Sequence, residues 1–271
     1  MRVMDLQERE YRKSGYFFAK EILTEEDLSG IRESVSRLSP KVFIPYSNVP
    51  WGYGNLIDNS DFISVIENKK IVEFCNKILG KDKYCFNHIM INNKAPWIGT
   101  SFEWHQEASN IDTYAPGYHA SECLDNFIQI YIAIDKHTLD NGCLRIIPES
   151  HKEGLLPHED IMIDRLVHKK RVPHATMTRI HEKCGYKPIV MNAGDVVFFN
   201  HLLIHGSSTN HSPFERRSIV IQARRLGTDR DEKTFARETS RRTEFVIREC
   251  EEKLRKLKEK NPYLDFNGGK K

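Results

Sequence analysis

The sequence has no two cysteines spaced by two residues, and this excludes a zinc ribbon or a thioredoxin-like motif. Its six cysteines are scattered and do not form the framework of a small secreted scaffold. No apolar run approaches the roughly 20 residues that a membrane-spanning helix needs. The charged start, residues 1–6, does not fit a signal peptide. We therefore expect a cytoplasmic protein with reduced thiols and no membrane association.

An excess of charge of one sign is also missing. The formal net charge is +3 with histidine neutral, which is too small to indicate a nucleic-acid or membrane partner. Positive residues gather after Arg224, where we interpret them as the solvated face of a helix. Hydrophobic residues make up 39% and charged residues 29% of the 271 positions, which is typical of a globular domain. Composition thus gives no argument for a nucleic-acid partner, and the oligomeric state stays open.

The first eighty residues predict helices around a short strand. Residues 15–19 are aromatic and strand-like. Thr24 and Asp27 form a capping-box pattern at the start of a helix, and an apolar residue follows at each helical turn. Residues 61–79 form a second apolar helical pattern, which Gly80 is expected to end.

From residue 83 onward the pattern changes to short strands separated by turns. The run at 127–134 is almost continuously apolar, which indicates a central strand. Residues 149–187 are polar and predict a lid-like excursion. Short strands with terminal helices predict a mostly β sandwich or barrel. We expect one domain over 1–271, made of a helical part (1–80), a β core (83–225) that contains the excursion, and a charged C-terminal helix (231–260).

Two potential metal ligands lie one residue apart in the stretch Trp104-His105-Gln106-Glu107. On a β-strand, residues i and i+2 point to the same face, so His105 and Glu107 can converge. The best third ligand is His205, which ends another apolar β run far downstream. Two histidines and one carboxylate suit non-haem Fe(II) with positions left open. The alternative interpretation of the His-x-Glu pair is an ordinary ion pair.

An arginine follows the second histidine closely and enters the last strand. A 2-oxoacid that chelates iron needs its far carboxylate held, and the guanidinium of Arg216 can do this with two hydrogen bonds. Ser218 lies two residues on and shares its face. The alternative is that Arg216 is a solvated turn residue. His201 precedes His205 by four residues, and we interpret it as a candidate neighbour of the metal ligands.

Five stretches, taken in order, resemble the phytanoyl-CoA dioxygenase-like family of Fe(II)/2-oxoglutarate oxygenases. The residues at 104–107 resemble the family's WHQD segment, and those at 140–152 resemble its NGxLxxxPGSHK segment. The other three stretches are 13–28, 194–207 and 210–216. The resemblance implies a double-stranded β-helix, the jelly-roll or cupin-like core.

The same resemblance implies roles for individual residues. Iron would be held by His105, Glu107 and His205, and 2-oxoglutarate by Arg216. Asn92 matches a position that contacts the cosubstrate. A further cosubstrate candidate, on the facing strand, is Gln129. This chain departs from the family in two places, with Glu107 where aspartate is usual and Glu149 where glycine is usual.

The implied activity is oxidation, by default hydroxylation, of an unactivated C–H bond with Fe(II), 2-oxoglutarate and O2. Residues expected to line the substrate pocket are Trp51, Tyr53, Trp97 and Phe102. The aromatic and cationic residues around them fit a polar small molecule, such as a natural-product intermediate, at least as well as a fatty acyl chain. Two alternatives stay open: a non-catalytic metal- or ligand-binding jelly-roll protein, and a metal-dependent isomerase on the same scaffold.

Overall fold

The computed structural model describes residues 5–38, 42–43, 50–52, 56, 59–81, 83–99, 101–110, 126–161 and 170–225. The helix predicted at 231–260 and the pocket candidate Tyr53 lie outside the described residues.

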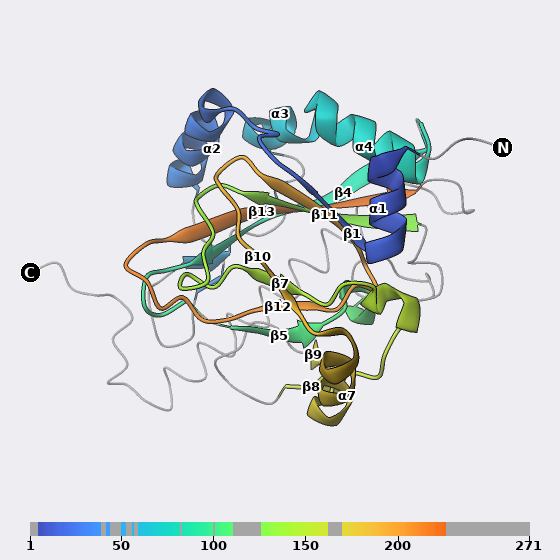
Figure 1. Ribbon diagram of the computed structural model, residues 1–271. Coiled ribbons are helices and arrows are strands. Elements are labelled where there is room, and N and C mark those ends of the chain that lie inside the picture. The colour runs from blue at the N-terminus through green and yellow to red at the C-terminus, as the bar shows by residue number, and fades with distance from the viewer. Residues whose placement is uncertain are drawn as a thin grey trace, which may run out of the picture.

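Two antiparallel sheets face each other across the molecule (Figure 1). The larger sheet has the order β1-β11-β6-β13-β4-β3-β2, and the smaller has the order β10-β7-β12-β5. The larger sheet consists of β1 (Tyr16–Ala19), β2 (Val42–Phe43), β3 (Pro50–Gly52), β4 (Tyr84–Lys94), β6 (Phe127–Ala133), β11 (Val196–Asn200) and β13 (Arg216–Arg225). The smaller consists of β5 (Phe102–His105), β7 (Leu144–Ile146), β10 (Lys187–Ile189) and β12 (His205–Ser207). Strands far apart in sequence are neighbours, and the predicted double-stranded β-helix core with flanking helices is confirmed.

Strand β6 lies in the middle of the larger sheet and is buried on both faces. Its even-numbered residues Ile128, Ile130 and Ile132 pack toward the helices. Its odd-numbered residues Tyr131 and Ala133 pack toward the smaller sheet. This double burial explains why the run from 127 to 134 is almost continuously apolar, as the sequence analysis inferred for a central strand.

Helices cover the outer face of the larger sheet (Figure 1). They are α1 (Leu6–Ser14), α2 (Glu25–Arg37), α3 (Ile63–Ile66), preceded by a 3₁₀ turn (Ser60–Phe62), and α4 (Lys69–Leu79). The predicted capping box is present, since the Thr24 hydroxyl accepts from the Asp27 backbone N–H and the Asp27 carboxylate accepts from the Thr24 backbone N–H. Phe74 of α4 stacks on Phe198 of β11 with ring centroids 4.1 Å apart. The helical part and the β core therefore share one hydrophobic core.

The excursion at 149–187 contains regular structure that the sequence analysis did not predict. Its elements are a 3₁₀ helix (Ser150–Glu153), the paired strands β8 (Glu159–Asp160) and β9 (Lys170–Arg171), and α7 (His174–Cys184). Met177 and Ile180 of α7 pack against Ile147 and Ile204 beside the smaller sheet. The helix was missed because only these two of its residues are buried, and the remainder read as a polar loop.

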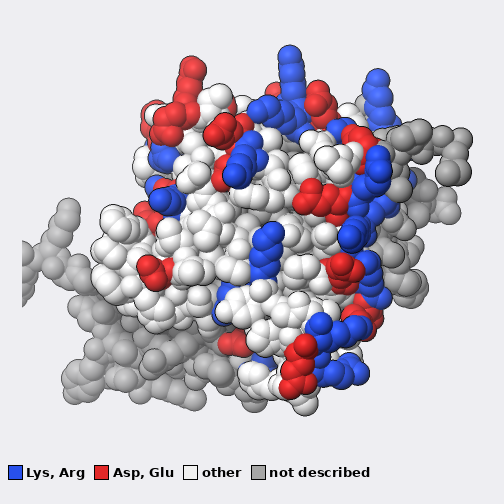
Figure 2. Space-filling model, in the orientation of Figure 1, with Lys and Arg blue, Asp and Glu red and all other residues white. Residues whose placement is uncertain are grey.

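Charges of both signs are interspersed on the visible face of the molecule. Figure 2 shows Lys and Arg side chains lying among Asp and Glu side chains, particularly over the helices above the larger sheet. This mixture agrees with the small net charge of +3. Nothing on this face indicates a polyanionic partner.

Glu149 provides a test of backbone strain. It adopts φ 67° and ψ −4°, a left-handed conformation that costs most residues about 1–2 kcal/mol but suits glycine. We expect Glu149→Gly to raise the melting temperature by roughly 1–4 °C, because relief of strain outweighs loss of the exposed ion pair to Lys152. Calorimetry would measure this shift.

The control for this substitution is Gly154, which has φ 72° and open space where a Cβ would lie. Gly154→Ala adds only backbone strain and should lower the melting temperature by a similar amount. If both substitutions shift the temperature in the same direction, the strain explanation is wrong.

Candidate metal and cosubstrate site

Two histidines face each other on neighbouring strands of the smaller sheet. His105 ends β5 and is paired with His205, which begins β12. Their ring centroids are 4.1 Å apart, and both residues are buried. The third predicted ligand, Glu107, reaches both rings, with its Oε1 atom 3.3 Å from His205 Nε2 and 3.7 Å from His105 Nε2. The three residues could together hold a metal ion.

The route by which Glu107 arrives differs from the expectation. We expected His105 and Glu107 to share a face of one strand, and this is wrong. The strand ends at His105, and Glu107 begins a 3₁₀ helix (Glu107–Asn110). The Glu107 carboxylate therefore reaches the two histidines from a turn, and its position depends on the contacts that hold this turn in place.

Backbone carbonyls fix the tautomer of both histidines. The Nδ1 atom of His105 lies 2.6 Å from the Glu103 carbonyl oxygen, and that of His205 lies 3.0 Å from the Leu203 carbonyl oxygen. A carbonyl only accepts, so each Nδ1 carries the hydrogen and donates it. Each Nε2 then keeps a lone pair directed at Glu107, which is the arrangement that a metal-binding histidine needs.

The protonation states also suit a metal. Burial and the adjacent His205 lower the pKa of His105, so its ring is neutral at neutral pH. Burial alone would raise the pKa of Glu107, but the adjacent His105 and His205 rings hold it well below the usual range. A neutral imidazole and an ionised carboxylate bind a cation without first losing a proton.

Gln106 fixes the turn, and its part was missed in the sequence. Its side chain is fully buried, and its Nε2 donates to the carbonyls of Gly154, at 2.8 Å, and Leu202, at 2.7 Å. Its Oε1 accepts from Leu156 N–H at 2.8 Å. One amide thus ties the metal-ligand turn to the excursion and to the segment before His205. The position of Gln106 between the candidate ligands His105 and Glu107 is the sequence feature that could have indicated this role.

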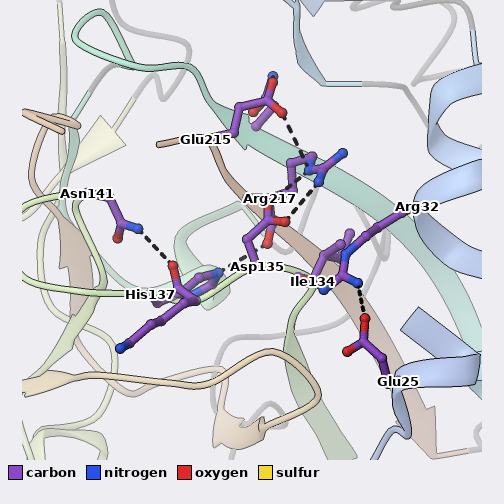
Figure 3. Close-up of polar contacts among 10 residues, drawn as sticks. Glu25, Arg32, Ile134, Asp135, His137, Asn141, Glu215 and Arg217 are labelled. Atoms are coloured by element: carbon purple, nitrogen blue, oxygen red, sulfur yellow. Dashed lines mark hydrogen bonds and ion pairs between the residues drawn. The ribbon is translucent and has the colours of Figure 1, made fainter. Parts of the chain in front are cut away.

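Three of the four predicted cosubstrate residues, Arg216, Ser218 and Asn92, lie at one end of the larger sheet. Arg216 begins β13 and is 2% exposed. Ser218 is paired with Asn92 of β4, and both are buried. Arg217 points the opposite way, where its guanidinium binds both carboxylate oxygens of Asp135 at 2.8 Å (Figure 3). Alternation along β13 therefore separates an internal arginine from an external one.

Several polar atoms in the interior have no hydrogen-bond partner within the part of the chain that the structure describes. They are Nε of Arg216, Oδ1 of Asn92 and Oε1 of Gln129. Gln129 lies opposite Gln222, whereas Ala133 lies opposite Ser218. Gln129 therefore lies four residues along β6 from Ala133, the residue that pairs with Ser218. Buried polar groups are normally satisfied, so these atoms are candidates for pairing with a bound polar ligand.

Two further residues join Arg216 and were not predicted. The Arg216 Nη1 atom donates to the hydroxyl of Tyr131. Lys94 is fully buried, with its Nζ 2.5 Å from the Ser208 carbonyl oxygen. Burial, Arg216 and Arg145 lower the pKa of Lys94 well below its usual value. Lys94 follows Asn92 by two residues in a strand, so the period of two could have identified it.

The structure describes the side chains of two candidate substrate-lining residues, Trp97 and Phe102. Trp51 lies in β3, and Trp97 is 62% exposed on the turn after β4. Phe102 begins β5, and Lys94 Nζ lies 5.3 Å from its ring centroid. Phe102 is therefore beside the cationic end of the sheet rather than beside Glu107.

His201 is buried in the interior and interacts electrostatically with Glu107 and His205, but it does not share a strand with His205, since β11 ends at Asn200 and β12 begins at His205. It is fully buried, its ring is 4.9 Å from that of Phe127, and its Nε2 is 3.4 Å from Nε2 of Gln222. Burial lowers the pKa of His201 to about 4 despite the nearby Glu107 carboxylate. His88, paired with Gln222 across the strands, has its pKa lowered to about 4 by the same causes.

A mononuclear metal site of two histidines and one carboxylate, inside a double-stranded β-helix, defines the class of non-haem iron oxygenases. The family model for phytanoyl-CoA dioxygenase (PhyH) matches residues 11–218. The chain belongs to this family, whose members are Fe(II)- and 2-oxoglutarate-dependent dioxygenases.

Individual relatives agree with this assignment. The chain is 25% identical over 240 residues to the peroxisomal phytanoyl-CoA dioxygenase of Homo sapiens, covering 80% of this chain and 67% of that protein. It is 27% identical over 168 residues to an ectoine dioxygenase of Streptomyces avermitilis, covering 59% and 54%. The crystal structure of EctD from S. alaskensis with 2-oxoglutarate and 5-hydroxyectoine has a TM-score of 0.66 at 18% identity, over 80% of this chain and 74% of that one.

None of the helices that the structure describes combines the length and the apolar character of a membrane span.

The position of Gln106 predicts a specific defect. Replacement by leucine keeps the volume but removes both donors and the acceptor, which leaves buried carbonyls unpaired. We expect Gln106→Leu to weaken Co(II) binding by about 10–100-fold, since groups that orient ligands have effects of this size. Titration followed by the visible spectrum of Co(II) measures it. Unchanged affinity in a folded variant would show that the amide does not position Glu107.

The depressed pKa values predict acid sensitivity of the metal-free protein. His88 and His201 titrate at about 4 when folded and near 6.5 when unfolded, so the unfolded state binds more protons between these values. Stability is full above about pH 6.5 and falls as pH drops toward about 4, by on the order of 3 kcal/mol for each histidine.

Urea unfolding across this pH window measures the loss. His201→Asn should reduce the slope by about 1.4 kcal/mol per pH unit, because one of the two titrating groups is removed. An unchanged slope in this variant would contradict the assignment to His201.

Proposed function

We propose that this chain hydroxylates an unactivated C–H bond of a polar small molecule, with iron held by His105, Glu107 and His205. The observation that carries this is the separation of two features within one interior: a three-ligand set on the smaller sheet and a buried cationic end on the larger sheet. A bound 2-oxoglutarate needs both a metal for its keto acid and a cation for its far carboxylate.

The residues present fit both groups. The ligand set consists of two imidazoles, whose Nδ1 atoms are bonded to backbone carbonyls and whose Nε2 atoms face Glu107, and one carboxylate, which suits Fe(II). Iron and 2-oxoglutarate, when bound, supply the oxidising chemistry with O2. The chain supplies the positions. Because a carboxylate occupies the third ligand position, halogenation is disfavoured, and hydroxylation is the default outcome.

Arg216 is assigned to the far carboxylate of 2-oxoglutarate. Its guanidinium is held from one side by the Tyr131 hydroxyl, while its Nε has no partner among the described residues. Lys94 adds a second buried cation nearby. A dianionic cosubstrate would relieve the repulsion between these cations, so its binding should favour the charged form of Lys94.

Apolar side chains separate the two ends and exclude water. The Phe199 ring lies 4.8 Å from the His205 ring. Val220 and Tyr131 pack in the cluster between the sheets. A dry interior strengthens the electrostatic contacts made there.

Cys75 and Cys143 are buried thiols, which supports our proposal that the protein acts in the reducing cytoplasm.

Anaerobic addition of Fe(II) and then 2-oxoglutarate to the metal-free protein tests the proposal. A weak visible charge-transfer band of the chelate is expected, and it should be lost in His205→Ala and in Glu107→Ala. If metal binds but no band forms, the protein is a binding module or an isomerase and not an oxygenase.

Substitutions of the adjacent residues Arg216 and Arg217 provide a matched test of the proposed cosubstrate site. Arg216→Gln should raise the 2-oxoglutarate concentration needed for the band by at least about 100-fold, since a buried charge pair is worth roughly 3 kcal/mol or more. Arg217→Gln removes the contacts to Asp135 and Glu215 on the outer side and should leave this concentration within about 3-fold. Equal effects of the two substitutions would remove Arg216 from the cosubstrate site.

A further inference from the structure

The inner face of the larger sheet changes character along its strands. Arg216 and Gln222, six residues apart on β13, lie roughly 20 Å from each other. The level of Gln222 is polar across three strands, because His88 of β4 and Gln129 of β6 are its direct cross-strand partners. With His201, whose ring nitrogen contacts the Gln222 amide, these residues form what we call the polar layer: His88, Gln129, His201 and Gln222.

The polar layer lies beside the metal ligands. The Glu107 carboxylate interacts electrostatically with both His88 and His201. His201 also interacts with His205. Phe199, which contacts the His205 ring, is the cross-strand partner of Gln129. A molecule held by this layer would therefore lie next to the metal, on the side away from Arg216.

Two buried atoms of the polar layer have no hydrogen-bond partner among the described residues. Nδ1 of His201 is buried and makes no hydrogen bond to any described residue, although the side chain is fully buried. Oε1 of Gln129 also makes no hydrogen bond to any described residue, and Gln129 is 5% exposed. Leaving such groups unsatisfied is costly in an interior, so their retention beside a reaction centre indicates a ligand.

We propose that the polar layer recognises the substrate, and that it selects a compact molecule with hydrogen-bonding groups next to the oxidised carbon in preference to an alkyl chain. The inference rests on the proposed function, because it takes the metal ligands as the reaction centre. An alkyl chain would bury the imidazole nitrogen and the amide oxygen against methylene groups and leave both unpaired. A cyclic amide, urea or hydroxylated ring could pair with both.

The experiment uses the full chain loaded with Zn(II) and 2-oxoglutarate, which cannot turn over. Binding of 2-imidazolidinone, 2-pyrrolidinone and prolinamide is measured by saturation-transfer NMR beside methylenecyclopentane and methylcyclopentane, which have similar shape without the polar groups. Mn(II) in place of Zn(II) then broadens the signals of any probe held close to the metal.

Two substitutions of His201 separate its two nitrogens. The amide of asparagine can stand in for Nδ1, and that of glutamine for Nε2. We expect His201→Gln to weaken binding of the polar probes by about 10-fold, the value of one buried hydrogen bond, and His201→Asn to keep it within about 3-fold. Melting curves and the Fe(II)–2-oxoglutarate band show that each variant is folded and loaded.

The outcomes distinguish the two proposals. Polar probes that bind near Mn(II), with loss in His201→Gln alone, support the polar layer. Hydrocarbon probes that bind as well as polar ones, or equal affinity in both variants and the parent, overturn it while the band keeps the oxygenase assignment intact. Absence of the band in the parent protein overturns both.

Discussion

The pairing of β5 with β12 is the constraint on which the site depends. It places His105 directly opposite His205, and the backbone carbonyls of Glu103 and Leu203 then fix which ring nitrogen faces Glu107. A shift in register by one residue would turn one histidine to the other face of the sheet. Because both rings are buried, the site cannot recover their position through side-chain rotation. Strand register thus sets the metal geometry before any metal is bound.

The two faces of the larger sheet differ in polarity, and the inner face contributes the polar residues that complement the metal ligands. The outer face is apolar, with isoleucines of β4, β6 and β13 and Phe198 of β11 packed under the helices. The inner face carries Arg216 and Lys94 at one end and the polar layer further along the strands. The apolar face supplies the hydrophobic stabilisation that lets the inner face bury Arg216 and Lys94. An anion at the charged end should therefore stabilise the whole fold as well as bind.

The sequence predicted the features that depend on periodicity and missed those that depend on turns. The central strand and the capping box at Thr24 followed from pattern and spacing. The grouping of His105, Glu107 and His205 was also anticipated, although the shared strand face that we expected for His105 and Glu107 was wrong. The course of the chain after His105 did not follow from pattern, because the strand stops where a tertiary hydrogen bond to Gln106 bends it. Helix α7 was missed for a related reason, since only two of its side chains are buried and its pattern is weak. The strands that contain Lys94 and Tyr131 were predicted, but the roles of these two residues were missed. Whether a lysine or a tyrosine is buried depends on its tertiary neighbours, here Arg216, which the strand pattern does not reveal.

The turn also accounts for a glutamate at a position where aspartate is usual in the family. If Glu107 extended the strand, one additional methylene would shift the carboxylate relative to two histidines whose backbone is fixed by the sheet. Because Glu107 instead begins a 3₁₀ helix, a change in the turn can absorb that length. The Gln106 amide holds this turn through contacts to Gly154 and Leu202, which are outside the strand itself. The identity of the carboxylate and the shape of the turn are then coupled. Glu107→Asp should consequently depend on Gln106 more strongly than the parent does, and the two substitutions should not be additive in metal affinity.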